Sequence, residues 1–134
     1  MRLYSFEKLE VWKLSRKLNK NIYQISEKFP DSEKFGLTSQ IRRASVSISS
    51  NIAEGSSRKS GIEQARFTEF AFGSLMEVLN QLILANDLKF INEQILNNER
   101  LLIEEIGNKL NKLKEVQLRK GHNSSYKQIK SNKQ

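Results

Sequence analysis

Residues 60–86 read SGIEQARFTEFAFGSLMEVLNQLILAN, and this stretch decides the fold. Ser60 and Glu63 fit a capping box, in which a hydroxyl and a carboxylate bind free backbone N–H groups at the start of a helix. The apolar residues that follow cover more than one face of this helix, so more than one face must be buried. In a four-helix bundle each helix keeps an outer face in water. The apolar residues that exceed the needs of one buried face therefore predict a subunit interface. The residues concerned are Phe67, Phe70, Ala71, Phe72, Leu75, Met76, Val78, Leu79, Leu82, Ile83 and Leu84.

Three further segments, approximately residues 6–29, 32–54 and 93–120, each carry one apolar stripe with the period of a helix. Pro30 separates the first two, because the residue before a proline is pushed out of the helical conformation. Gly55 follows the second segment, in a position typical of the glycine that ends a helix. The stripes are Val11, Leu14, Leu18, Ile22, Ile25 and Phe29, then Leu37, Ile41, Ala44, Ile48 and Ile52, then Ile95, Leu102, Ile106, Leu110 and Leu113.

Four helical segments with short connections and no strand-like alternation predict an all-α protein. We expect an antiparallel up-down-up-down four-helix bundle formed by residues 1–120. Gly121 is predicted to end the last helix. The polar residues 121–134, which include Lys127, Lys130 and Lys133, are predicted to be a disordered basic tail.

The composition argues against catalysis and metal binding. The chain has no cysteine, and its single histidine, His122, lies in the predicted tail. It has no glycine-rich phosphate loop and no GxSxG or HExxH motif. We therefore expect no catalytic residue, no metal, no cofactor and no enzyme activity. Since no stretch resembles a signal peptide or approaches the ~20 apolar residues of a spanning helix, we also expect a cytoplasmic protein without membrane contact.

Positive charge is concentrated in the first half of the chain. The net charge is +8, and residues 1–60 hold 12 Lys and Arg against 6 Asp and Glu, whereas residues 61–120 hold 8 against 9. A basic half beside a balanced half is the distribution expected when one face meets phosphate. The alternative is that the charge serves only solubility.

The best candidate for phosphate contact is the basic stripe, which we define as Lys13, Arg16, Lys17 and Lys20. Their three- and four-residue spacing places them on one helix face, opposite the apolar stripe. The alternatives are an ordinary solvated helix face and, less consistently with a buried apolar face, a membrane-surface helix. A second basic zone is expected from Arg42, Arg43, Arg58 and Lys59. The alternative is that Arg43, or with less weight Arg42, pairs with an acidic neighbour.

A serine-rich segment, residues 44–55, holds polar groups near the end of the second helix. Asn51 and Glu54 lie one turn apart there, and Gly73 with Ser74 could face the small side chains across a close helix approach. One interpretation is a ligand or partner site. The other, which we favour, is a hydrogen-bond network that fixes the packing register. Arg43 either contacts RNA or pairs with an acid such as Glu77.

Taken together, these motifs resemble a known family. They are Phe6-x-x-Leu9-x-Val11-Trp12, Phe29-Pro30, Gly36-Leu37-x-x-Gln40-x-x-Arg43-Ala44, Ser47-Ile48-x-x-Asn51-Ile52-Ala53-Glu54-Gly55-x-x-Arg58 and Phe67-x-x-x-Ala71-x-Gly73-Ser74-Leu75-x-Glu77. The chain resembles the bacterial four-helix-bundle proteins encoded in intervening sequences of 23S ribosomal RNA genes. It is also similar to the accessory bundle proteins of diversity-generating retroelements. The resemblance implies a homopentameric ring with a basic surface that binds RNA.

The first functional hypothesis is a non-enzymatic, homo-oligomeric bundle that binds RNA electrostatically and without sequence preference. The expected contacts are Lys13, Arg16, Lys17, Lys20, Arg42, Arg58 and Lys59. Base stacking is not expected, because few exposed aromatic residues accompany these cations. The second hypothesis is an adaptor ring that docks a partner protein such as a nucleic-acid enzyme, and it gains if Phe70 or Phe72 stays exposed. The third is a self-assembling scaffold.

Overall fold

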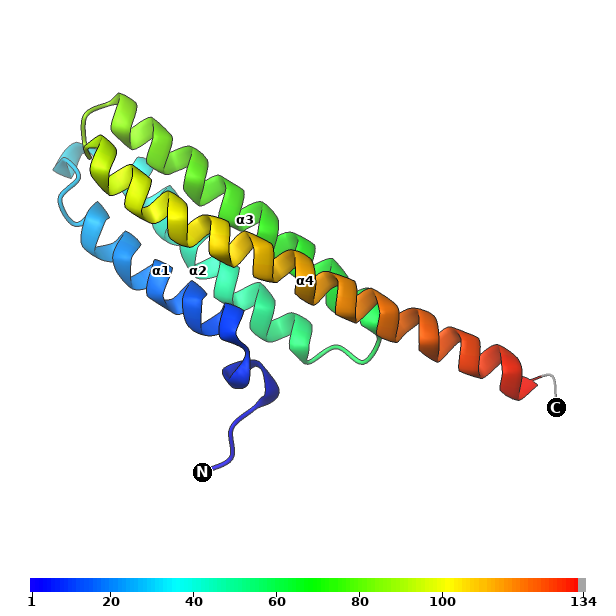
Figure 1. Ribbon diagram of the computed structural model, residues 1–134. Coiled ribbons are helices and arrows are strands. Elements are labelled where there is room, and N and C mark those ends of the chain that lie inside the picture. The colour runs from blue at the N-terminus through cyan, green and yellow to red at the C-terminus, as the bar shows by residue number, and fades with distance from the viewer. Residues whose placement is uncertain (133–134) are drawn as a thin grey trace.

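Four long helices lie side by side and alternate in direction (Figure 1). A computed structural model describes the backbone of residues 1–132 and the side-chain surroundings of residues 1–120. The helices are α1 (Glu10–Ser26), α2 (Leu37–Ser56), α3 (Gly61–Asp87) and α4 (Glu93–Asn132), and two short 3₁₀ turns, η1 (Ser5–Lys8) and η2 (Asp31–Glu33), precede α1 and α2. Each helix packs on the next, and α1 closes the bundle against α4. The predicted all-α fold, an up-down-up-down four-helix bundle, is confirmed.

The bundle core is made from the predicted stripes. Phe29, in the connection from α1 to α2, packs against Phe90 with ring centroids 5.7 Å apart and closes one end of the core. On α4 the seam runs through Leu96 and Ile103, which are more buried than the predicted Ile95 and Leu102. The fully buried large side chains are Leu18, Ile22, Ile41, Ile48, Leu75, Val78, Leu82, Ile103, Ile106 and Leu110.

The starts of α3 and α4 follow from their capping residues. The Ser60 hydroxyl accepts a hydrogen bond from the Glu63 backbone N–H at 3.1 Å, as the capping motif predicts. Asn92 does the same for α4, because its side-chain oxygen accepts from the Ile95 N–H at 2.9 Å. These caps satisfy N–H groups that have no partner within the helix.

The two glycines predicted to end helices do not do so. Gly55 lies inside α2, which continues to Ser56, and no glycine among the described residues has a positive φ. Gly55 is instead buried against α3, where a Cβ would come within 2.8 Å of the Phe67 Cβ. Gly121 lies inside α4, which runs to Asn132, because a single glycine weakens a helix by about 1 kcal/mol and does not by itself stop it. The predicted tail of residues 121–134 lies outside the part of the chain whose side chains are described.

Helix α3 leaves part of its apolar surface in water. Its inner face is buried, but Phe70 is 47% exposed, Met76 38% and Leu84 43%. Phe72 is half-buried. The excess of apolar residues in the sequence of α3 thus corresponds to an exposed apolar surface on the single chain.

Candidate nucleic-acid interface

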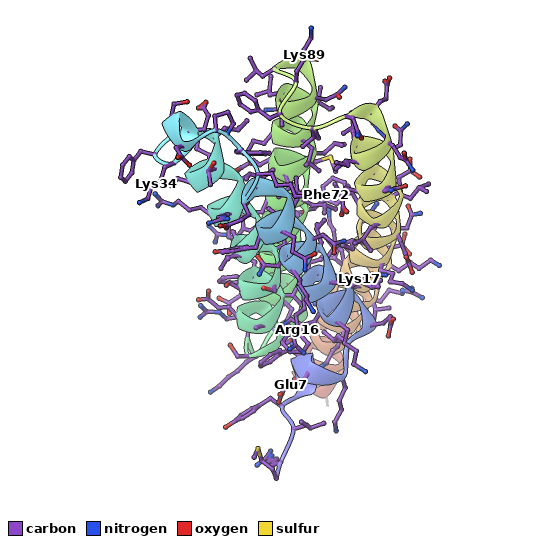
Figure 2. The ribbon with its side chains drawn as sticks, turned by 90° about the vertical axis from the view of Figure 1, so that its left-hand side faces the viewer. Glu7, Arg16, Lys17, Lys34, Phe72 and Lys89 are labelled. Carbon is purple, nitrogen blue, oxygen red and sulfur yellow. The ribbon has the colours of Figure 1, made fainter. Side chains whose placement is uncertain are left out.

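The basic stripe lies along the outer face of α1. Lys13, Arg16, Lys17 and Lys20 are all exposed, while Val11 and Ile22 of the same helix are buried in the core. Arg16 and Lys17 follow one another along α1 in Figure 2. The Arg16 guanidinium lies 4.9 Å from the centroid of the Trp12 ring, a cation–π contact that holds it at the surface.

One acidic side chain lies beneath the stripe, where α1 meets α4. Glu99 of α4 is 8% exposed, and its carboxylate accepts a hydrogen bond from the Asn21 side-chain N–H at 3.1 Å. Burial raises the pKa of Glu99, and the Asn21 hydrogen bond and the positive charge of Lys17 oppose this effect. Within residues 1–120, Lys13, Arg16 and Lys20 make no ion pair.

Arg42 joins α2 to the end of α1. Its Nε donates to the Ser26 hydroxyl at 2.8 Å, and its Nη2 donates to the Tyr23 carbonyl at 3.3 Å and pairs with Glu27 at 3.2 Å. The guanidinium also lies 4.6 Å from the centroid of the Tyr23 ring. Pairing was expected for Arg43 more than for Arg42, but Arg42 is the paired residue. Arg43 is exposed and has no ion-pair partner among residues 1–120.

Arg58 forms a similar junction at the other end of α2. It pairs with Glu54 at 2.8 Å and lies 4.6 Å from the centroid of the Phe67 ring of α3. Its backbone carbonyl accepts from the Gln64 side chain at 2.9 Å. Lys59 beside it is exposed. The seven cations proposed for phosphate contact thus extend along α1 and to both ends of α2 and do not form a single cluster.

The serine-rich segment and α3 share a hydrogen-bond network. The Asn51 side-chain N–H donates to the Ser47 carbonyl at 2.8 Å and to the Ser47 hydroxyl at 3.0 Å. The hydroxyls of Ser47 and Ser74 are 2.9 Å apart across the α2–α3 contact. Ser74 therefore faces the small side chains of α2. Gly73 is exposed, and a Cβ there would meet nothing within 4 Å, so it does not line the close approach.

Beside this network lies an open polar groove between α2 and α3, with a volume of about 500 Å³. Arg43 and Glu77 both line it without forming an ion pair. The side-chain oxygen of Gln81, a residue 9% exposed, is buried there without a hydrogen-bond partner in the described part of the protein. We call it the α2–α3 groove, and its lining is Gln40, Arg43, Ala44, Ser47, Ser74, Glu77 and Gln81.

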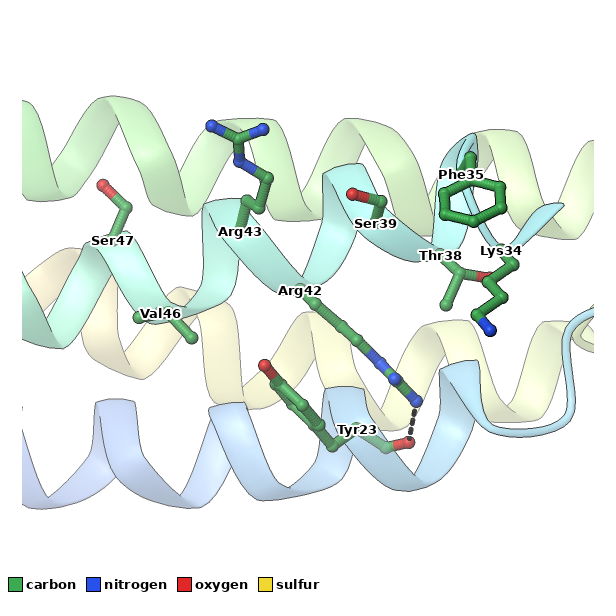
Figure 3. A pocket seen from close by; sticks show the side chains of 9 residues that line it. All are labelled: Tyr23, Lys34, Phe35, Thr38, Ser39, Arg42, Arg43, Val46 and Ser47. Atoms are coloured by element: carbon green, nitrogen blue, oxygen red, sulfur yellow. Dashed lines mark hydrogen bonds between the residues drawn. The ribbon is translucent and has the colours of Figure 1, made fainter.

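A second groove, with a volume of about 670 Å³, lies on the first half of α2 (Figure 3). Its lining includes residues that the sequence did not indicate as site residues, among them Lys34 and Phe35. The available signal was Phe35 itself, a large apolar residue just before Gly36 and outside every apolar stripe. We call it the Phe35 groove, and its lining is Tyr23, Lys34, Phe35, Thr38, Ser39, Arg42, Arg43, Val46 and Ser47.

Two kinds of site are not seen in the described residues. That part of the chain holds no group of three or more His, Cys, Asp or Glu side chains placed to bind a metal ion. None of its helices combines the length and apolarity needed to cross a bilayer.

Comparison with known proteins identifies a family and a similar fold. The family model described as "23S rRNA-intervening sequence protein" matches residues 7–112. A crystal structure of a protein of unknown function from the S23 ribosomal protein family of Bacteroides thetaiotaomicron VPI-5482 is similar, with a TM-score of 0.58 and 19% sequence identity over 81% of this chain and 95% of that one. No curated protein matches the chain. The structural likeness supports the bundle fold.

Proposed function

The chain belongs to the family of 23S rRNA-intervening sequence proteins, and from this premise we propose that it is a non-enzymatic, homo-oligomeric bundle that binds RNA electrostatically. The observation that carries the proposal is the basic stripe. Its four cations are exposed on one helix face, and α1 holds no acidic residue after Glu10. A solvated helix face for solubility alone would be expected to mix charges of both signs.

The geometry of the stripe suits a phosphate backbone. Lys13 and Lys20 are two helical turns apart, a distance of roughly 10 Å along the axis at 1.5 Å per residue. This length covers about three nucleotides of a stacked strand, whose charges recur about every 3.4 Å. Contacts of this kind release counterions and carry no base information, so binding is strongly salt-dependent and independent of sequence.

Self-assembly is supported by the exposed apolar surface of α3. Phe70, Met76 and Leu84 lie on a helix whose opposite face already fills the core, and their exposure leaves apolar area for a second copy to cover. The resemblance described above implies a pentameric ring. In such a ring the basic stripe is repeated, and repeated weak contacts raise the total affinity for one long RNA.

The test is size-exclusion chromatography with light scattering of the full chain, with and without total cellular RNA, at low and high salt. We expect an assembly that takes up RNA at low salt and releases it at high salt. Replacing Lys13, Arg16, Lys17 and Lys20 by Gln should weaken binding at least tenfold, because phosphate contacts are lost. For single-stranded RNA, the salt slope should also fall by about 0.7 for each lost contact.

The matched control replaces four exposed cations elsewhere, Arg66, Lys112, Arg119 and Lys120, by Gln. It removes the same charge and should retain most of the binding. An equal loss in the two variants would show that only net charge matters and would reject the basic stripe as the site. Failure of the unmodified protein to bind RNA at low salt would reject the function.

A protein-docking adaptor is the second candidate, and the exposure of Phe70 favours it. Substitution of Phe70 and Met76 by Glu separates the two roles of this surface. If the assembly dissociates, the surface joins copies of the chain and is not free for another protein. If the mass is unchanged, the surface is open to a partner, as an adaptor requires.

A further inference from the structure

The Phe35 groove combines features that the basic stripe lacks. Its lining includes three cations, Lys34, Arg42 and Arg43, two aromatic side chains, and no carboxylate. We propose that it is a subsite for an unpaired nucleotide, in which Phe35 stacks on the base while Lys34 and Arg43 bind the adjoining phosphates. The proposal rests on the RNA binding proposed above and adds to it a preference for single-stranded RNA.

The first argument is the exposure of the Phe35 ring. Phe35 is 91% exposed, although burial of a phenylalanine side chain stabilises a protein by about 1.5–3 kcal/mol. Leu37 and Phe29 are part of the buried core, whereas Phe35 lies outside it. Most of the ring surface is therefore accessible to a planar ligand. The Lys34 ammonium lies 5.7 Å from the ring centroid, so aromatic and cationic groups meet at one point.

The second argument is the rigidity of the opposite wall. Arg42 is fixed by its bonds to Ser26 and Tyr23 and by its pair with Glu27, and in Figure 3 it extends from α2 toward Tyr23 on α1. Arg43 points to the other side of α2 in the same view. The groove thus has a fixed wall on one side and an unpaired cation on the other.

The third argument is charge complementarity. The negative charge of Glu27 balances the positive charge of Arg42 in an ion pair. Lys34 and Arg43 have no ion-pair partner among residues 1–120. An apolar protein segment placed here would remove these two cations from water without a compensating charge, which is costly. A nucleotide supplies both a flat base for Phe35 and an anion for the cations, and stacking on an aromatic side chain contributes about 1–3 kcal/mol per base. A duplex offers no unstacked base, so stacking on Phe35 should not contribute to duplex binding.

The experiment measures fluorescence anisotropy of the full chain with a labelled oligoadenylate and with a labelled RNA duplex of equal charge. Phe35→Ala should weaken oligoadenylate binding by roughly tenfold or more, the equivalent of one lost stacked base, and leave duplex binding within twofold. Phe35→Trp should restore oligoadenylate binding, because the larger ring still stacks. The control is Leu101→Ala, at an apolar residue of α4 that is 68% exposed, and it should change neither affinity.

The outcomes separate this subsite from the wider function. If the unmodified protein binds neither RNA, the proposed function fails and the subsite with it. If it binds both RNAs and Phe35→Ala weakens neither, or both equally, the subsite is overturned while the function stands. A lower assembly mass of Phe35→Ala in light scattering would also overturn the subsite, since Phe35 would then join copies of the chain.

Discussion

At the scale of single residues, the two glycines of the α2–α3 region have opposite surroundings. Gly55 is buried where the helices come closest, and Gly73 faces open space. From the sequence, Gly55 was expected to end a helix, and Gly73 was a candidate for the close approach between helices. Sequence spacing cannot separate a glycine that ends a helix from one that admits a neighbour, because the difference depends on where the partner helix lies.

We predict that Gly55→Ala destabilises the protein. A Cβ at 2.8 Å from the Phe67 Cβ forces α2 and α3 apart, and overpacking of this kind costs about 1–3 kcal/mol, more than the ~1 kcal/mol gained in helix propensity. Gly73→Ala is the matched control and should stabilise by about 0.5–1 kcal/mol, since nothing lies within 4 Å. Urea unfolding measures both. Changes of the same sign would mean that helix propensity, not the contact, dominates.

At the scale of helices, the apolar stripes were predictable and the junctions between helices were not. Ile41 and Ile48 lie in the core because helical periodicity alone determines which face of α2 is apolar. The partners of Arg42 depend on which part of α1 lies opposite, and periodicity holds no such information. The start of α2 was also placed too early, since Asp31–Glu33 form the separate turn η2 and the helix begins at Leu37.

We predict that Arg42→Lys lowers the free energy of unfolding by about 1–2 kcal/mol, because an ammonium cannot reproduce the forked bonds to Ser26 and Tyr23. Arg43→Lys, at an exposed residue of the same helix, should change stability by less than about 0.5 kcal/mol. Thermal and urea unfolding test this, and equal effects of the two substitutions would contradict the bracing role of Arg42.

At the scale of the whole molecule, the sequence predicted a bundle with a basic first half. The structure adds that Glu99 of α4 is buried against α1, the helix that carries the basic stripe. Glu99 was not selected from the sequence, because a glutamate in a charged helix is normally solvated. Its burial follows from the closure of α1 onto α4, a contact between opposite ends of the chain.

We predict that Glu99 makes the bundle more stable at mildly acidic pH than at neutral pH. The pKa of Glu99 is raised in the folded state, so the folded protein binds its proton more readily than the unfolded chain does. This contribution is fully present below the ordinary glutamate pKa and is lost as the pH rises through the raised value. Glu99→Gln should raise the melting temperature at pH 7 and reduce its dependence on pH in this range.

The control for this prediction is Glu104→Gln, at an exposed residue of α4, which should leave the pH dependence as it is. A wild-type melting temperature that falls steadily from pH 7 to pH 5, and is not altered by Glu99→Gln, would contradict the role of Glu99.

The short connections between antiparallel neighbours have a consequence for how the protein forms. Residues 57–60 and 88–92 join helices that pack directly on each other, so most contacts arise between segments that are close along the chain. Helical domains with such local contacts fold in microseconds to milliseconds. Encounters between finished protomers are far slower at cellular concentrations, and their rate depends on concentration. If the chain assembles as proposed, newly made protomers therefore pass through a folded, unassembled stage whose lifetime depends on the concentration of protomers.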